Sequence, residues 1–444
     1  MTHITSQGRR RVAITGLGAV TPLGLTTMDT WSGLVDGRSG VGPITRFDPT
    51  GCPVQFAAEV KGFEPAAAIL APEKAVHPRG AGSEAVTAAV SQKDAKKLGR
   101  FTHLGLAAAL QAYADSGLDQ VRDQIRPERM GVNMGVGLGG LPEIEGTRDA
   151  FHKTGYRRIS PFFILQVAPN ILSGQTAILL DCRGPNMSNT AACATSGHSL
   201  GESLRVIQRG EADVMIAGGS EAAITPLAVG AFAQMRALST RNDAPTAASR
   251  PYDRDRDGFV IGEGSVVFVL EELEHAKRRG ARIYAELVGY AATGDAYHLS
   301  SLAPEAEGSR RAMQLALDDG QVNAADVDYV SAHATSTPGG DAEEGAAIAS
   351  VFAPAKERLH VSGIKSMTGH LLGGAGAFGC LAAVLAVHHG VIPPTINLEN
   401  VDPACAALGL NFTPNKAVEK PVRRALANAF GFGGTNSSLV VAKI

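Results

Sequence analysis

A cysteine in a turn of small residues is the first candidate for chemistry in this sequence. Cys193 lies in Asn-Thr-Ala-Ala-Cys-Ala-Thr-Ser-Gly, residues 189–197, where the turn is expected to lead into an amphipathic helix. Backbone N–H groups and the dipole at a helix start favour the thiolate, which is the nucleophilic form of cysteine. A lone buried cysteine is more often a small core residue. The assignment of Cys193 as a nucleophile therefore depends on its partners.

Two histidines much later in the chain are candidates for these partners. His333 begins His-Ala-Thr-Ser-Thr-Pro at the end of an expected buried strand, and His370 ends Lys-Ser-Met-Thr-Gly-His, which starts at Lys365. A further motif, Gly-Phe-Gly-Gly-Thr-Asn, surrounds Phe432 near the C-terminus. Each motif alone is weak, because a single histidine is usually a core residue. The four motifs in this order are highly specific and favour covalent catalysis at Cys193.

The composition is that of a folded chain with little net charge. The 444 residues could form one large α/β domain or two mid-sized halves. The 41 basic and 43 acidic side chains leave a net charge of −2, which argues against a surface that binds nucleic acid or membrane throughout. A local basic patch for an acidic partner remains compatible with this balance.

Cysteine usage and hydropathy indicate a cytoplasmic protein. The five cysteines are dispersed and lack any Cys-X-X-Cys pair, so neither a disulfide framework nor a zinc site is expected. The first ten residues contain no apolar segment of a signal peptide. The apolar stretch 371–387 is interrupted by glycines, so we expect no membrane span.

Short apolar runs alternate with helical patterns along the chain, which predicts a layered α/β architecture. The expected buried strands are residues 12–15, 130–136, 214–217, 266–270, 329–332 and 426–430, and the expected helices are 101–116, 193–209, 309–319 and 371–387. The polar stretch 239–258 is interpreted as a crossing between two halves, residues 1–262 and 263–444. Residues 71–94 are expected to form a surface excursion.

Two motifs that resemble ligand sites are better explained by local structure. Residues 253–258 imitate the start of a calcium loop, but the position that requires a bidentate glutamate is Gly264. Gly16-Leu17-Gly18 follows a strand, but the third glycine of a dinucleotide fingerprint is missing. We therefore expect neither a metal nor a nucleotide cofactor.

The four motifs together resemble the elongating β-ketoacyl-acyl-carrier-protein synthases, most closely those of the synthase II type. The resemblance extends from about Arg10 to Ile444 and includes Arg-Ile-Ser-Pro-Phe-Phe at 158–163 and Arg-Ala-Leu-Ser-Thr at 236–240. It implies the thiolase fold, with two similar βαβαβαββ halves in a five-layered αβαβα arrangement, and a homodimer. Cys193 would come from the first half and both histidines from the second.

The resemblance also implies a catalytic role for each motif. Cys193 would carry the acyl group, and His333 and His370, as neutral imidazoles, would stabilise the enolate formed from malonyl-acyl-carrier-protein. A cation on Lys365 would help to keep the histidines neutral, and Glu344 matches the acidic residue that pairs with this lysine. No cofactor would be needed.

Further residues match the family's substrate and partner contacts. Phe432 would provide a backbone oxyanion donor and a gate, Thr335 and Thr337 would bind the pantetheine arm, and Phe232 and Leu138 would line the gate and acyl tunnel. The acyl carrier protein is acidic and would dock on basic residues, for which the candidates are Lys96, Lys97, Arg157, Arg158 and Arg236.

Three alternatives differ in what they require of the sequence. A polyketide-type ketosynthase would share every catalytic residue named above. A thiolase would need a second catalytic cysteine near the C-terminus, which is missing, and a non-catalytic chain-length-factor subunit would lack Cys193. The pair of histidines, in place of the histidine and asparagine of initiating synthases, indicates malonyl-acyl-carrier-protein as extender. The residue after His333 is often glycine in the family and is Ala334 here.

Overall fold

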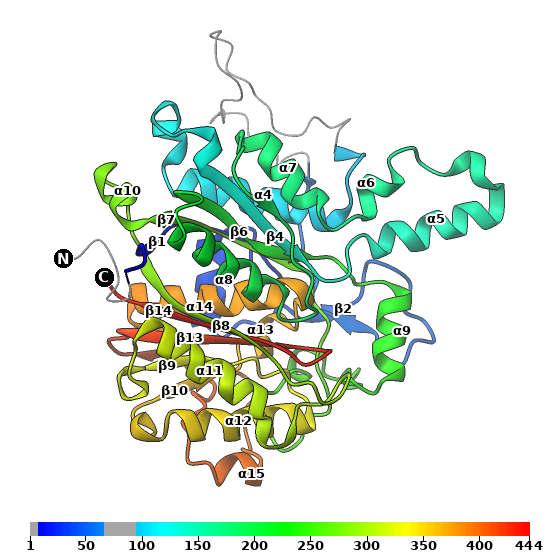
Figure 1. Ribbon diagram of the computed structural model, residues 1–444. Helices are drawn as coiled ribbons and strands as arrows, with labels where there is room; N and C mark the ends of the chain where they lie inside the picture. Colours follow the sequence, from blue (N-terminus) through cyan, green and yellow to red (C-terminus); the bar gives the residue numbers. More distant parts are fainter. Residues whose placement is uncertain (1–7, 66–94) are drawn as a thin grey trace.

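The computed structural model describes residues 8–65 and 95–444, and its strands form one ten-stranded sheet and two small hairpin-like pairs (Figure 1). The predicted excursion at 71–94 lies outside the described residues. The large sheet consists of β1 (Val12–Val20), β4 (Met130–Val136), β5 (Asn186–Met187), β6 (Val214–Glu221), β7 (Gly264–Glu272), β8 (Ala285–Gly294), β9 (Tyr329–Ser331), β10 (His360–Ser362), β13 (Arg424–Gly431) and β14 (Thr435–Ala442). The small pairs are β2 (Gly42–Pro43) with β3 (Phe56–Ala57) and β11 (Val391–Ile392) with β12 (Val418–Glu419).

The helices include the four that were expected, with small shifts of their ends, and nine others within the described residues. They are α1 (Thr27–Val35), α4 (Arg100–Asp115), α5 (Leu141–Thr154), α6 (Phe163–Val167), α7 (Ile171–Leu180), α8 (Thr195–Gln208), α9 (Pro226–Gln234), α10 (Leu273–Arg278), α11 (Glu307–Gly320), α12 (Pro338–Val351), α13 (Lys365–Thr368), α14 (Ala375–His389) and α15 (Pro403–Ala406). Short 3-10 turns include η3 (Tyr156–Arg158) and η8 (Leu372–Gly374). Each of the six predicted strands overlaps an observed one.

The sheet contains the same topology twice. From the centre of the sheet outward, the strands on one side have the order β1-β7-β6-β4-β5. Those on the other side have the order β8-β14-β13-β9-β10. In each set the first three strands pair antiparallel and the last three pair parallel. The two sets meet where β1 pairs with β8 through only two residues, Ala13 and Ile14. The repeated order indicates two similar halves.

The strand order favours a boundary between β7 and β8. The predicted division at residue 262 would separate β7 from β1 and β6, with which it pairs. Three charged side chains of the polar stretch 239–258, those of Arg250, Asp253 and Arg256, are buried in the body of the protein. Asp253 and Arg256 are nearly inaccessible, and Arg250 bonds Asp253 at 3.1 Å.

Helices α8 and α14 form the central layer of the molecule (Figure 1). Their apolar side chains, among them Leu204 and Leu381, share one hydrophobic core with strands of both halves. Helices α4 and α7 cover the outer face of the first half, and α11 and α12 that of the second, each with its own core. The result is a five-layered α-β-α-β-α stack. Burial between two sheets explains why α14 is apolar all round.

The segment Leu372–His389 is long and apolar enough to cross a membrane by length and composition alone. By this criterion the glycines do not interrupt the apolar run. However, 89% of the segment is buried inside the protein, between the two halves. It is the core helix that the five-layered stack requires.

Candidate active site

Cys193 lies at the tip of a tight turn immediately before α8. Ala192 has a positive φ of 45°, and Ala194 N–H bonds the carbonyl of Ala191 at 3.0 Å. The Thr195 hydroxyl accepts the N–H of Ala191 at 2.7 Å and so closes the turn onto the helix. Small residues allow this geometry, which directs the half-buried Cys193 side chain away from the helix axis.

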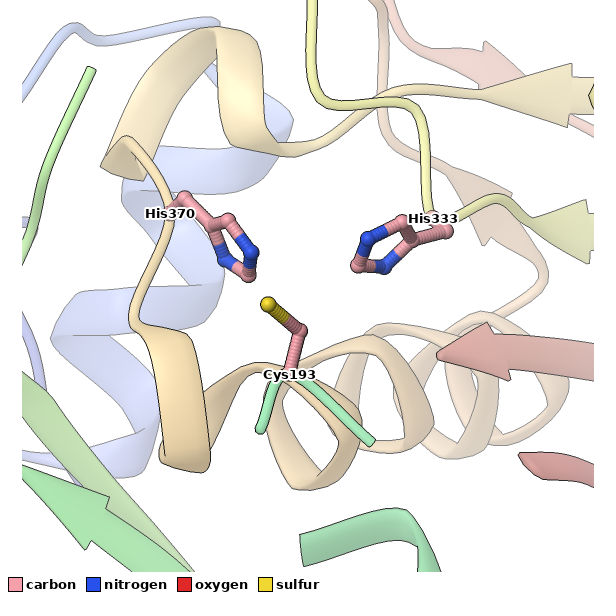
Figure 2. A group of neighbouring side chains, drawn as sticks. All are labelled: Cys193, His333 and His370. Carbon is pink, nitrogen blue, oxygen red and sulfur yellow. The ribbon is translucent and has the colours of Figure 1, made fainter. Parts of the chain in front are cut away.

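The two histidines reach Cys193 from the other half of the fold. His333 follows β9, and His370 follows α13, where its backbone bonds Val260 and Gly262 at 2.7 and 2.9 Å. The imidazole centroids are 5.3 Å apart at an interplanar angle of 82°. Figure 2 shows both rings directed toward the sulfur from opposite sides. Sγ and one nitrogen of each ring lie within 4.8 Å of one another, a donor set that could also hold a soft metal ion.

Glu344 and Lys365 hold the backbone around His333. The Glu344 carboxylate accepts the N–H groups of His333 and Ala334 at 2.8 and 2.7 Å. Lys365 Nζ donates to the carbonyl of His333. The direct ion pair expected between Glu344 and Lys365 is not among the ion pairs of the described residues. Instead, each group bonds the same strand end, and their charges interact through space.

Ala334 has a φ of 29°, in the left-handed region that glycine adopts most easily. A residue with a β-carbon pays roughly 1–2 kcal/mol for this conformation. The bond from Glu344 to the Ala334 N–H helps to hold it. The alanine in place of the family's usual glycine is therefore accommodated.

Both imidazoles are neutral at physiological pH. Burial lowers the pKa of His333 and of His370 well below the usual value, and the positive charge of Lys365 lowers both further. Burial lowers the pKa of Lys365 itself to about 8. Nδ1 of His370 accepts the N–H of Leu372 at 3.3 Å, which leaves the proton on Nε2. Within the described residues, neither Nε2 of His370 nor Nδ1 of His333 has a hydrogen-bond partner.

Burial raises the pKa of the Cys193 thiol to about 11, although Lys365 and the backbone N–H groups of Phe432 and Cys193 oppose this shift. The sequence had predicted a lowered pKa from the helix dipole. Desolvation of the thiolate outweighs the effect of the helix, which begins two residues later at Thr195. The two N–H groups nevertheless converge on the sulfur.

This pKa predicts the pH dependence of Cys193 alkylation. The thiolate fraction is small at neutral pH, so the rate of iodoacetamide labelling should rise from pH 7 to about pH 10 without a plateau. The measurement is peptide mass mapping in a Cys52→Ser background, because Cys52 is the only other cysteine that is not buried. A plateau below pH 7 would show that the dipole dominates after all.

A cavity of about 500 Å³ surrounds the three side chains. The structure brings the predicted substrate residues to its lining, namely Leu138, Phe232, Thr335, Thr337 and Phe432. The hydroxyl groups of Thr335 and Thr337 lie 3.0 Å apart. Leu138 and Phe432 are 47% and 39% exposed, as expected for apolar side chains that face an empty cavity.

The sequence analysis missed Glu221, which also lines the cavity. Its carboxylate is fully buried at the end of β6, and burial raises its pKa to about 7. The available signal was an acidic residue at the end of a buried strand, two positions after a pair of glycines. Asp341 was missed as well. It accepts N–H groups of Tyr252 and Ser336 and supports the turn after His333.

The five basic residues proposed to dock the carrier protein lie on three segments of the chain, at 96–97, 157–158 and 236. Lys96 is exposed, and its carbonyl accepts the side chain of Gln166 on α6 at 3.0 Å. Lys97 Nζ lies 5.2 Å from the ring of Phe162, just before α6. Arg157 and Arg158 are exposed in η3. Arg236 is exposed after α9, and its sequence neighbours Met235 and Ala237 line the cavity.

Comparison with known proteins assigns the chain to a family. The model of the β-ketoacyl synthase N-terminal domain matches residues 9–276, and that of the C-terminal domain matches residues 284–399. Proteins named 3-oxoacyl-[acyl-carrier-protein] synthase 2 from Coxiella burnetii and a Synechocystis species are 46% and 44% identical to the chain. Both alignments cover 98% of this chain, and 99% and 98% of the relatives.

The chain belongs to the β-ketoacyl synthase family.

Solved structures of β-ketoacyl synthase relatives agree with this assignment and show that the five-layered stack is the thiolase fold. A β-ketoacyl synthase from Burkholderia phymatum has a TM-score of 0.85 at 33% identity, over 98% of this chain and 99% of that one. The ishigamide ketosynthase/chain length factor has a TM-score of 0.85 at 34% identity, over 98% and 100%. A type II polyketide ketosynthase, solved in complex with its acyl-carrier protein and bound to the hexaketide, has a TM-score of 0.83 at 30% identity, over 98% and 100%.

Proposed function

We propose that this β-ketoacyl synthase elongates fatty acids by condensing malonyl-acyl-carrier-protein with an acyl group held on Cys193. The observation that carries the proposal is the convergence of the Cys193 sulfur and two neutral imidazoles in one cavity. The test is incubation with acyl- and malonyl-loaded carrier protein, followed by mass spectrometry of the product. A β-ketoacyl product two carbons longer, with release of CO₂, is expected. Absence of that product would overturn the proposal.

The first step would transfer the primer to Cys193. The sulfur attacks the thioester carbonyl, the C–S bond to the carrier arm breaks, and the carrier thiol leaves with the proton that the cysteine lost. The N–H groups of Phe432 and Cys193, which already point at the sulfur, would be the donors for the developing oxyanion. Thr335 and Thr337 would bind the pantetheine arm at the cavity wall.

The second step would remove CO₂ from the malonyl group. The carbon–carbon bond breaks, and its electrons form an enolate whose oxygen needs hydrogen-bond donors. The free nitrogen of His370 carries a proton and His333 offers a second unpartnered nitrogen, so both rings are available to this oxygen. The enolate carbon then attacks the acyl carbonyl, and the sulfur of Cys193 leaves. Lys365 and Glu344 would hold the backbone of His333 in place, and the positive charge of Lys365 would keep both rings neutral.

Two alternatives are less well supported. The chain is 46% and 44% identical to proteins named synthase 2 but only 30% identical to the polyketide ketosynthase. A non-catalytic chain-length-factor role would leave Cys193 and the surrounding cavity without purpose.

We further propose that the chain is a cytoplasmic homodimer whose partner subunit packs against the apolar side chains of α5 and α6 and leaves the arginines of η3 exposed. These helices project from the body of the protein (Figure 1). Apolar side chains are exposed along this projection, including Tyr156 at 72% and Ile164 at 66%. Sedimentation equilibrium should give twice the chain mass of 45.9 kDa. A monomer at micromolar concentration would contradict the proposal.

The basic residues near α6 and α9 are proposed as the docking surface for the acidic carrier protein. Charge reversal at Arg157, Arg158 and Arg236 should raise KM for the carrier-bound substrate and reduce its salt dependence, because electrostatic steering is lost. A short pantetheine thioester should react as before. The matched control is Arg126→Glu, because the side chain of Arg126 is 77% exposed. Arg126 precedes the amino-terminal end of β4, whereas the cavity lies at the carboxyl-terminal end of that strand. Equal damage with both substrates would refute the surface.

A further inference from the structure

One buried carboxylate joins two segments of the cavity wall. Glu221, at the end of β6, accepts backbone N–H groups from Gly137, Leu138 and Gly139 at 3.0–3.2 Å. It also accepts the N–H of Gly373 in η8 at 3.2 Å. Its side chain is fully buried, and no ion pair to it occurs among the described residues. Within the described part of the chain, four backbone N–H groups are therefore the hydrogen-bond partners of this carboxylate.

The two segments that Glu221 joins have different roles in the cavity. The loop 137–140 carries Leu138, whose side chain faces the cavity. On the other side, Gly373 follows Leu372, whose N–H bonds His370. The Glu221 carboxylate thus connects two parts of the cavity wall. One is the loop 137–140, where an acyl tail would lie, and the other is η8, which follows the proposed catalytic His370.

The backbone contact between the segments requires glycine on both sides. A β-carbon on Gly373 would lie 2.4 Å from the nitrogen of Gly137 and 2.8 Å from Oε2 of Glu221. A β-carbon on Gly137 would lie 2.4 Å from the same oxygen. Such distances are far inside van der Waals contact, so the close approach and the carboxylate form one tightly packed unit.

We propose that Glu221 is a positioning residue that fixes the loop 137–140 against η8 and thereby sets the length of acyl primer that the cavity accepts. The inference rests on the proposed function, since it concerns the same cavity. With the loop held, Leu138 stays in the path of the acyl tail. With the loop released, Leu138 can swing aside and longer tails can enter.

The test is Glu221→Gln in the full-length protein. The amide nitrogen cannot accept an N–H and turns a donor toward other donors, so the loop should detach. The ratio of kcat/KM for palmitoyl primer to that for hexanoyl primer should rise by roughly tenfold, the effect of one lost hydrogen bond to a charged group. The control is Glu59→Gln, because Glu59 is a buried carboxylate that accepts the N–H groups of Thr45 and Arg46 outside the cavity lining.

A second variant decides the question if Glu221→Gln does not fold. Gly373→Ala should push the loop away while leaving the carboxylate intact, and should raise the same ratio. An unchanged ratio, or an equal loss of rate for every primer, in the folded variant overturns the inference. So does a change of the same size in Glu59→Gln. Failure of the wild-type protein to condense any primer would instead overturn the proposed function.

Discussion

Replacing Cys193 by alanine should abolish condensation, with a loss of roughly 10⁴- to 10⁶-fold, as is usual when a covalent nucleophile is removed. A thioester requires a thiol, and Cys193 is the one cysteine among the described residues that line the cavity. The measurement is product formation from acyl- and malonyl-loaded carrier protein. The folded state of the variant is checked by its melting temperature, since a half-buried cysteine contributes little to the core.

Intact-mass analysis of the wild-type protein with primer alone provides the complementary result. One acyl adduct is expected, and it should map to Cys193. Cys182, Cys380 and Cys405 are buried and do not line the cavity, so the primer cannot reach them. An adduct on any of these three in place of Cys193 would contradict the assignment. In the alanine variant, malonyl decarboxylation without primer should persist, because both histidines remain.

Much of the fold could be predicted from local sequence. The apolar runs that became β4, β6 and β9 are buried on both faces, and such strands need no alternation to be recognised. The boundary between the halves could not be found in this way. A polar stretch with many charges is typical of a linker, but here Asp253 and Arg256 are buried in a bonded network that only the tertiary structure creates.

The candidate site shows the same limit. The motifs indicated that Cys193, His333 and His370 would meet, because their order along the chain resembles that of a known family. Their environment was not predictable, since the pKa of Cys193 depends on burial by segments far away in the chain. Glu221 was missed for the same reason. Its donors come from residues 137–139 and 373, and no local pattern reveals a contact across that separation.

Replacing His333 or His370 by alanine should reduce malonyl decarboxylation by roughly 10²- to 10³-fold, the usual loss for one oxyanion donor. Both residues line the cavity, and each ring has one buried nitrogen that lacks a hydrogen-bond partner within the described residues. Burying an unpaired polar atom is costly unless a ligand satisfies it. The enolate oxygen is the group that would do so. The measurement is CO₂ release from malonyl-carrier-protein, with acylation of Cys193 followed separately by mass.

The pH dependence distinguishes neutral donors from charged ones. Because the pKa of each ring lies well below its usual value, neither imidazole gains a proton as the pH falls through 6.5. Decarboxylation by the wild-type protein should therefore stay constant through that range and decline only at more acidic pH. If an imidazolium were the donor, the rate would rise as the pH falls. Acylation of Cys193 should be less affected than decarboxylation in the His333→Ala or the His370→Ala variant. The oxyanion formed during acylation lies at the N–H groups of Phe432 and Cys193, not at the histidines. Full decarboxylation in the double variant would exclude both histidines from the step.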